Sequence, residues 1–336
     1  MDEPSFFKVD RKKILKSLGT ERLKSTLRSM LAIRHFEIRA EAAYQQGNVG
    51  GFFHAYIGQE AIATACVDYL GKDHWYTTTY RCHALALLLG VSAKEAMAEL
   101  YGKATGNAKG RGGSMHFFSD RMLGGFGIVG GHVPLAAGAG FSLKYQNQKG
   151  LSVCFLGDGA VAQGAVHETL NMAALWDLPC LFIIENNQWG MGTAVNKAIS
   201  INPIAEKLAH TYGLKGYSVD GLDYLSCYGC FENACEEIIH QKKPVVVEAF
   251  TQRFRGHSIS DPALYRTKED LKKITENDPI DLLSLELIKA GVLRTDEYEL
   301  MSKEEKEKVL AAMEFASSSP YPNLACLEED VFYISK

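Results

Sequence analysis

The sequence lacks an apolar run long enough to cross a membrane, an excess of basic residues and a visible signal peptide. Its 336 residues carry 36 Lys and Arg against 40 Asp and Glu, a net charge of −4. Nucleic-acid binders need a basic excess or a basic stripe, so we expect no nucleic-acid partner. The longest apolar runs fall well short of the roughly 20 residues of a membrane helix, and no basic segment followed by an apolar stretch opens the chain. We therefore expect no membrane association and a cytoplasmic location.

A recognisable set of metal ligands is also missing among the eight cysteines. Cys154 and Cys180 lie inside apolar runs, which is typical of reduced, buried thiols in a cytosolic protein. Cys227, Cys230 and Cys235 stand close together, but they supply only three thiols, and no second CxxC pair or HxxxH pair stands nearby. We interpret these three as packed or surface thiols of a helix.

What the sequence does contain is the pattern of an α/β protein. Apolar residues make up 46% and charged residues 23%, an ordinary globular composition. Short apolar runs at 151–156 and 178–184 predict buried parallel strands, and further strands are predicted at 216–220 and 244–250. Helical patterns alternate with these runs. The sequence therefore predicts a doubly wound, mostly parallel sheet flanked by helices.

Three regions divide the chain within one integrated domain. We expect an N-terminal helical extension (1–50), an α/β core (51–265) that holds the site, and a C-terminal helical region (266–336). Glycine crowds residues 102–140, which predicts loops whose backbone closely approaches another group.

The clearest site signal is Gly157-Asp158-Gly159 followed by Asn186-Asn187. Asp158 and Asn187 each come just after a predicted strand, and ligands in open α/β sheets bind outside the carboxyl ends of the strands. A carboxylate and an amide oxygen suit Mg²⁺, which is usually shared with substrate phosphates. The helix predicted from about Ala160 would direct its free N–H groups to the same place. GDG alone is better explained as a tight turn, but together with Asn186-Asn187 it predicts a metal-bridged diphosphate site.

Further candidates lie elsewhere in the chain. Tyr80-Arg81 could clamp a phosphate, although a surface arginine explains the pair equally well. Arg253 and His257 follow the predicted strand 244–250, and His257 or His54 could act as an acid or base near neutral pH.

Residues 125–130, GFGIVG, match the dinucleotide-binding pattern GxGxxG. That motif requires a strand immediately before it, and the preceding residues, SDRML, do not predict one. We therefore favour a flexible loop that closes over a cofactor and keep a NAD-binding dehydrogenase as an alternative.

Several motifs together resemble one enzyme family. GDG, then 26 residues, then Asn186-Asn187 resembles the thiamine diphosphate motif. Residues 157–193 as a whole resemble the α subunits of the thiamine-diphosphate-dependent 2-oxo acid dehydrogenases, and most closely the pyruvate dehydrogenase type. The resemblance spans about residues 20–290 and implies the thiamine diphosphate-binding fold. The other matching segments are HAYIGQEA (54–61), YRCHA (80–84), GRGGSMH (110–116), GGFGIVG (124–130) and RFRGHSISDP (253–262).

This resemblance implies roles for individual residues. Mg²⁺ would be bound by Asp158, by the side chain of Asn187 and by the main-chain oxygen of Trp189. His257 would act beside the cofactor, His54 would contact the bound 2-oxo acid, and His83 would line an access channel. The implied cofactor-binding residues are Tyr80, Arg81, Gly127, Val129, Asp158, Gly159, Ala160, Asn187, Arg253 and His257.

The resemblance also implies an activity and partners. The chain would be the α subunit of an enzyme that decarboxylates pyruvate and transfers the acetyl unit to the lipoyl group of a dihydrolipoyl acetyltransferase. A β subunit would supply the glutamate beside the aminopyrimidine, in an α₂β₂ heterotetramer. An acetoin dehydrogenase α subunit and a non-catalytic, regulatory α-like subunit are the alternatives. Ala162, Phe126 and His132 depart from the common pattern of the family, and Ser258 matches a serine that kinases modify in mitochondrial relatives.

Overall fold

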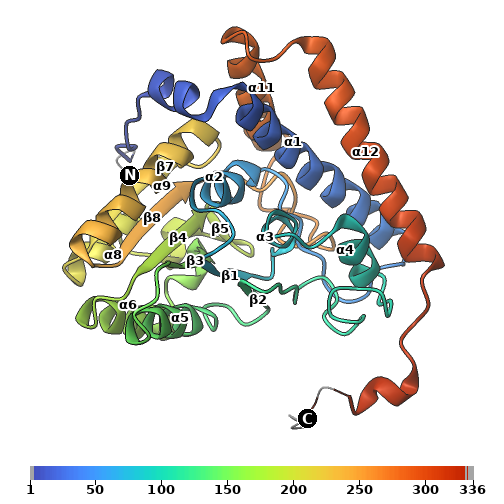
Figure 1. The fold of residues 1–336 in the computed structure, drawn as a ribbon, viewed down its shortest axis with the longest axis horizontal. Helices are drawn as coiled ribbons and strands as arrows, with labels where there is room; N and C mark the ends of the chain where they lie inside the picture. The colour runs from blue at the N-terminus through green and yellow to red at the C-terminus, as the bar shows by residue number, and fades with distance from the viewer. Residues whose placement is uncertain (1–3, 330, 332–336) are drawn as a thin grey trace.

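The computed structural model describes residues 4–329 and residue 331. Residues 1–3, 330 and 332–336, which belong to the expected N- and C-terminal regions, lie outside the described residues. The centre of the fold is a six-stranded, fully parallel sheet in the order β2-β1-β3-β4-β8-β7 (Figure 1). Its strands are β1 (Trp75–Thr79), β2 (Met122–Phe126), β3 (Ser152–Gly157), β4 (Cys180–Asn186), β7 (Lys215–Asp220) and β8 (Val245–Phe250). A two-stranded ribbon consists of β5 (Trp189–Gly190) and β6 (Thr193–Ala194).

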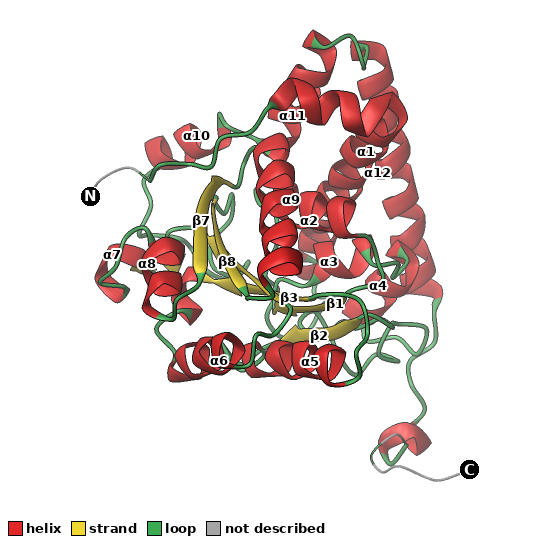
Figure 2. Ribbon diagram, turned by 60° about the vertical axis from the view of Figure 1, so that its left-hand side comes forward, coloured by secondary structure: helices red, strands yellow, loops and turns green. Residues whose placement is uncertain are grey.

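Helices cover both faces of this sheet, as the sequence predicted (Figure 2). Helices α5, α6 and α8 pack on one face, and α2 and α9 pack on the other, where α1, α11 and α12 add a further layer. The helices are α1 (Arg11–Gln45), α2 (Glu60–Leu70), α3 (His83–Leu88), α4 (Ala93–Leu100), α5 (Val133–Tyr145), α6 (Gly164–Leu175), α7 (Val195–Ala198), α8 (Ile204–Thr211), α9 (Tyr224–Gln241), α10 (Lys268–Thr275), α11 (Pro279–Lys289) and α12 (Thr295–Ser318). Two short 3₁₀ turns are η1 (Asp158–Ala160) and η2 (Leu324–Leu327).

Two apolar cores lie on the two faces of the sheet. Along β3, Val153 and Phe155 join the core beneath α2 and α9, while Cys154 and Leu156 join the core beneath α5 and α6. Successive side chains of a strand point to opposite faces, and here both faces are buried. This is why β3, β4 and β8 read as unbroken apolar runs and were correctly predicted.

Two local expectations were wrong, and one strand was missed. A strand, β2, does lead into residues 125–130, because Met122–Phe126 pairs with the edge of β1 despite its two glycines. Strand β1 itself was not predicted, since WYTTT has few aliphatic residues, yet its Thr77 and Thr78 are buried. The helix expected from Ala160 begins at Gly164, after the 3₁₀ turn η1.

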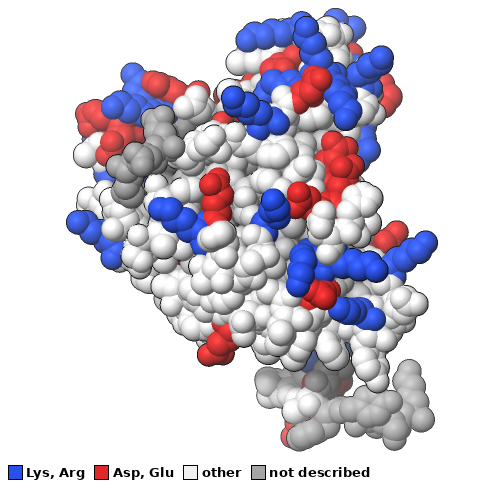
Figure 3. Space-filling view, turned by 90° about the vertical axis from the view of Figure 1, so that its left-hand side faces the viewer, with Lys and Arg blue, Asp and Glu red and all other residues white. Residues whose placement is uncertain are grey.

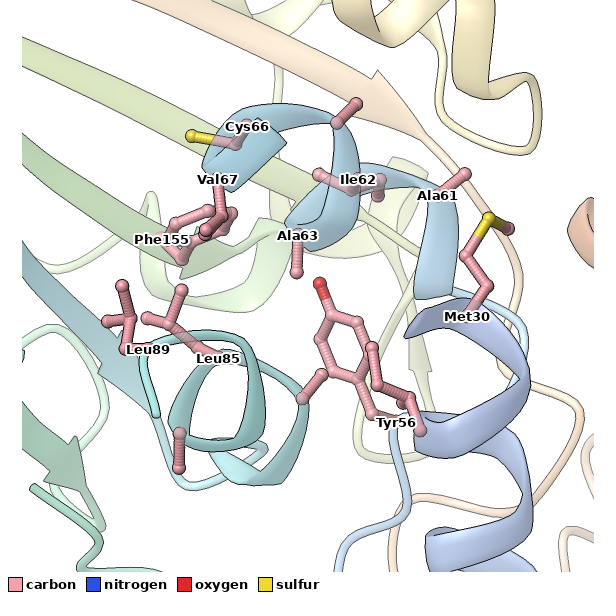
Figure 4. Packing of buried hydrophobic residues seen from close by; sticks show 14 of the residues in the cluster. Met30, Tyr56, Ala61, Ile62, Ala63, Cys66, Val67, Leu85, Leu89 and Phe155 are labelled. Atoms are coloured by element: carbon pink, nitrogen blue, oxygen red, sulfur yellow. The ribbon is translucent and has the colours of Figure 1, made fainter. Parts of the chain in front are cut away.

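The core beneath α2 and α9 also contains the segment that leads into α2. Figure 4 shows Tyr56 lying among Met30 of α1, Ala63 of α2 and Leu85 of α3. The Tyr56 hydroxyl donates a hydrogen bond to the carboxylate of Glu185 on β4. Helix α2 is therefore tied to the carboxyl end of β4 through the residues that precede it.

The glycine-rich stretch 106–113 folds around one buried carboxylate. Glu99, near the end of α4, is fully buried. Its two oxygens accept hydrogen bonds from the backbone N–H groups of Ala108, Gly110, Gly112 and Gly113 at 2.7–3.1 Å. A side chain at Gly112 would meet the carbonyl oxygen of His116 at 2.7 Å. The close backbone approach expected from the glycines is thus made to a residue of the chain itself.

The three clustered cysteines, Cys227, Cys230 and Cys235, lie buried on α9, where burial raises the pKa of each thiol. Across residues 4–329 and 331, none of the helices combines the length and apolar character required to span a bilayer.

One buried ion pair links the helical layer to the start of α2. Arg34 of α1 donates to Glu60 at 2.6 Å and to both oxygens of Asp278 at 2.6 and 3.2 Å, and the Glu60 side chain is 0% exposed. We expect Arg34→Met to lower the free energy of unfolding by about 3–5 kcal/mol, because it leaves Glu60 buried without its counter-charge.

Urea denaturation followed by tryptophan fluorescence measures this loss. Lys303→Met is the control, since Lys303 pairs with Glu307 on the surface at 3.9 Å, and it should leave the midpoint almost unchanged. Equal midpoints for the two variants would contradict the assigned role of Arg34.

Candidate active site

The carboxyl ends of four neighbouring strands bring the predicted residues together. In sheet order, β1 is followed by Tyr80 and Arg81, β3 by Asp158, β4 by Asn187, and β8 by Arg253. A cavity of about 640 Å³ opens at this edge. Its lining includes every residue predicted for the site except His83, namely His54, Tyr80, Arg81, Gly127, Val129, Asp158, Gly159, Ala160, Asn187, Trp189, Arg253 and His257. Their chemical roles remain predictions.

Two buried oxygen atoms of the cavity have no hydrogen-bond partner. They are Oδ2 of Asp158 and Oδ1 of Asn187. The Asn187 amide nitrogen donates to Oε1 of Gln59 at 3.2 Å, which leaves the amide oxygen as the free atom. A carboxylate and an amide oxygen are hard donors of the kind that Mg²⁺ takes, with the remaining positions filled by main-chain oxygen, water and phosphate. The donor set therefore fits the expected cation.

This donor set contains a single carboxylate. Within the described part of the chain, no group of three or more His, Cys, Asp or Glu residues could hold a metal ion. A cation at Asp158 would thus draw most of its ligands from neutral oxygens and from a bound anion, which is how Mg²⁺ is shared with phosphates.

Burial sets the protonation of Asp158. Its side chain is 2% exposed. Burial raises the pKa of this carboxyl to about 6, while Arg253 and nearby backbone N–H groups oppose the rise. Without a cation, the ionised carboxylate is costly in this environment.

Arg81 is buried, so the interpretation of it as a surface arginine is wrong, while its role as a phosphate clamp stays a prediction. Its guanidinium donates to the carbonyl oxygen of Ala55 at 2.7 Å and to that of His257 at 2.5 Å. Burial lowers the pKa of Arg81 to about 10. The guanidinium therefore stays positively charged at neutral pH, and the two carbonyl oxygens fix its orientation.

Arg253 is also buried, and hydrogen bonds to surrounding loop residues fix its position. It donates to Nδ1 of His257 at 3.0 Å, to the carbonyl oxygen of Met191 at 3.1 Å and to the hydroxyl of Tyr265 at 3.2 Å, while its Nε has no partner. Asp261 in turn accepts from the Tyr265 hydroxyl at 2.7 Å and from the backbone N–H of His257 at 2.6 Å. Because a guanidinium only donates, Nδ1 of His257 accepts, and a neutral His257 carries its proton on Nε2.

The two predicted histidines lie beside these arginines and are neutral. The rings of His54 and His257 are 5.0 Å apart. Burial, followed by the charge of Arg81, lowers the pKa of His54 to about 2 and that of His257 to about 4. An anion bound between Arg81 and Arg253 would offset those charges and raise both pKa values. The cavity is therefore suited to an anionic ligand.

His83, by contrast, does not line the cavity, and the expectation that it lines an access channel is wrong. It is fully buried, with Nδ1 3.0 Å from Glu37 Oε1 and Nε2 2.8 Å from the carbonyl oxygen of Ser114. These two partners satisfy both ring nitrogens inside the core.

The cavity also contains residues that the sequence did not single out. Glu185 lies one residue before the Asn186-Asn187 pair, and burial raises its pKa to about 7. Gln59 belongs to the matching segment HAYIGQEA, which was the available signal for it. Among the departures from the family pattern, Phe126 and His132 stack at 5.8 Å and line the cavity, while Ala162 is exposed.

The fold and the cavity define an α/β protein whose cavity, at the carboxyl edge of the sheet, contains groups suited to a cation and to an anionic ligand. Comparison with known families gives this class a name. The model of the family described as "Dehydrogenase E1 component" matches residues 28–325, and the chain belongs to this family. The prediction from the motifs is confirmed at this level.

Several curated proteins similar to the chain carry the name "Pyruvate dehydrogenase E1 component subunit alpha". The protein of this name from Rickettsia bellii is 40% identical over 319 residues, which cover 94% of this chain and 96% of that protein. The one from Rhizobium meliloti is 41% identical and covers 90% and 88% of the two chains. The one from Zymomonas mobilis is 43% identical and covers 90% and 86%.

The raised pKa of Asp158 has a consequence for stability. A carboxyl whose pKa rises from 3.8 to about 6 on folding stabilises the fold below pH 4, and this contribution is lost as the pH rises towards 6. Above pH 6 the cost is on the order of 3 kcal/mol. We expect Asp158→Asn to raise the thermal midpoint of the protein without Mg²⁺ or cofactor at pH 7.5, and to flatten its dependence on pH between 4 and 6.

Differential scanning calorimetry across this pH range measures both effects. Asp120→Asn is the matched control, because Asp120 is exposed. A lower midpoint for Asp158→Asn than for the control at pH 7.5 would show that the carboxylate is not strained by burial.

Proposed function

We propose that this chain is the α subunit of a pyruvate dehydrogenase E1 component. With a β subunit it decarboxylates pyruvate and transfers the acetyl unit to the lipoyl group of a dihydrolipoyl acetyltransferase, using thiamine diphosphate and Mg²⁺. Membership of the E1 family and the shared name of its relatives support this assignment. The observation that carries the cofactor assignment is the pair of unpartnered oxygens of Asp158 and Asn187 in a cavity that also contains Arg81 and Arg253.

The cation and the diphosphate would be held by different groups. Asp158, Asn187 and the main-chain oxygen of Trp189 would bind Mg²⁺. Tyr80, Arg81 and Arg253 would bind the diphosphate, with Gly159 and Ala160 beside it, and Gly127 and Val129 would present backbone to the aminopyrimidine. A side chain at Gly159 would meet Cα of Gly190 at 3.1 Å, so the chain already packs closely where the phosphates would lie.

When bound, thiamine diphosphate supplies the electron sink for the pair of electrons released as CO₂ leaves. The chain's own residues supply position and charge. Arg253 fixes the ring of His257 through Nδ1, so that Nε2–H is free to donate a hydrogen bond. His54, whose ring centroid lies 4.3 Å from that of Tyr80, would contact the 2-oxo acid. A bound diphosphate would bring the pKa of His257 closer to neutral, where an imidazole can transfer a proton.

An exposed apolar rim supports the proposed β subunit. Ile128 is 77% exposed, Met191 65% and Val129 43%, and all three line the cavity. Large apolar side chains exposed at the mouth of a polar cavity are typical of a surface that a partner covers. Figure 3 shows one face of the molecule, where charged side chains gather at the top and across the middle and uncharged ones cover most of the area below. We propose that the partner closes the cavity and supplies the glutamate beside the aminopyrimidine, in an α₂β₂ heterotetramer.

An assay of pyruvate oxidation with an artificial electron acceptor tests this function. The chain is co-purified with its β chain and supplied with thiamine diphosphate and Mg²⁺, and acetoin and branched-chain 2-oxo acids are assayed in parallel. We expect pyruvate turnover that requires both chains. Asp158→Ala should lower it by at least about 100-fold, since losing groups that only orient metal ligands already costs about 10–100-fold. Asp120→Ala should leave it unchanged.

Each other outcome identifies a different protein. Turnover of acetoin alone would make the chain an acetoin dehydrogenase α subunit. A stable complex that binds the cofactor but turns over none of the substrates would indicate a regulatory subunit and remove the catalytic roles of His54 and His257.

A further inference from the structure

Gln59 is a cavity residue to which the proposed function gives no role. It immediately precedes α2, its side chain is fully buried, and it lines the cavity beside Asn187. Its amide oxygen accepts the hydrogen bond from Asn187, but its amide nitrogen, Nε2, has no partner. A buried amide nitrogen left without an acceptor is costly, so a group is needed to accept from it.

The backbone around Gln59 is fixed on both sides by the chain that leaves β8. The Thr251 hydroxyl donates to the carbonyl oxygen of Gly58 at 3.0 Å, and the Phe254 N–H donates to that of Ile57 at 3.2 Å. Gly58 has a φ of +97°, and a side chain there would lie 2.4 Å from the carbonyl oxygen of Gln252. Only glycine allows this close approach, and the position of Gln59 is therefore set before any ligand binds.

The contact between Gln59 and Asn187 decides which end of the Asn187 amide faces the cavity. A carboxamide has one acceptor oxygen and one donor nitrogen. Because Gln59 offers its oxygen to Asn187, Asn187 must turn its nitrogen towards Gln59 and keep its oxygen, Oδ1, free. If Gln59 were absent, the Asn187 amide could rotate and present N–H groups, which repel a cation.

The same contact fixes the direction of the Gln59 amide. Its oxygen is occupied by Asn187, so Nε2 is the end left to serve the cavity. The unpartnered atoms of the cavity thus include the acceptors Asp158 Oδ2 and Asn187 Oδ1 and the donors Gln59 Nε2 and Arg253 Nε. Acceptors suit a cation, and donors suit the oxygens of an anion bound to it.

We propose that Gln59 is a positioning residue that orients the amide oxygen of Asn187 towards Mg²⁺ and donates a hydrogen bond from its own Nε2 to an oxygen of the Mg²⁺-bound diphosphate. This inference rests on the proposed function, because it takes thiamine diphosphate as the ligand. In this arrangement the two hydrogen-bonded amides act together. Oδ1 of Asn187 faces the cation, and Nε2 of Gln59 faces the anion.

Two substitutions separate the two parts of this role. Gln59→Glu keeps an oxygen that accepts from Asn187 and so preserves its orientation, but it replaces the donor with an acceptor that repels phosphate. Gln59→Met has a similar length and removes both interactions. Gln146→Glu and Gln146→Met are the matched controls, because Gln146 is exposed at the end of α5 and lies outside the cavity.

Binding is measured on the complex with the β chain, without turnover. Calorimetric titration with thiamine diphosphate at saturating Mg²⁺ gives the cofactor Kd. Titration with Mg²⁺ at saturating thiamine diphosphate gives the Kd for Mg²⁺, which we call the metal requirement. For Gln59→Glu we expect a cofactor Kd raised by about tenfold or more, as for a lost hydrogen bond to a charged group, with a metal requirement within about twofold of wild type. For Gln59→Met we expect both values to rise by about tenfold.

The two hypotheses fail in different ways. Wild-type values in both Gln59 variants would overturn the role of Gln59, as would an equal loss of metal and cofactor affinity in Gln59→Glu. If the wild-type complex itself bound no thiamine diphosphate, the proposed function would fall instead. Should Gln59→Met not assemble with the β chain, Gln59→Glu alone decides the matter, because only the proposed role predicts a weaker cofactor with an unchanged metal requirement.

Discussion

The parallel arrangement of neighbouring strands is the constraint on which the site depends. Parallel strands all end at the same edge of a sheet, so the residues after β1, β3, β4 and β8 meet there although they are far apart in sequence. The crossover helices that parallel strands require bury both faces of the sheet. Polar side chains such as Asp158 and Arg253 can therefore gather only at this edge, and the same apolar layers that stabilise the fold keep water away from them.

Several buried charged and polar groups of the cavity have no matching partner within it. Arg81 and Arg253 face two neutral histidines, and Asp158 and Asn187 leave oxygens unpartnered. Each of these groups is costly when buried alone. A ligand that carries a cation and an anion together would satisfy them at once, and ligand binding would then stabilise the fold by mass action. The apolar side chains buried on both faces of the sheet offset this cost.

Much of this could be predicted from the sequence, for identifiable reasons. Asp158 and Asn187 follow strands that unbroken apolar runs reveal, so their convergence was predictable. Strand β1 was not, because its threonines become buried only through tertiary contacts. His83 seemed functional by its motif, but its partner Glu37 is 46 residues away and makes it part of the core. The amide direction of Gln59 depends on a residue 128 positions away, which no local pattern reports.

The carboxylate of Glu99 has a further consequence for the glycine-rich loop beside the cavity. Backbone N–H groups gathered around one point form a site that would otherwise attract an external anion. Here the anion is the Glu99 side chain of the same chain. Its hydrogen bonds hold the loop that leads to Met115 on the cavity wall. A loop that is already ordered loses little conformational entropy when a ligand arrives. The glycines of this segment therefore give the molecule a rigid wall, although their number alone suggests flexibility.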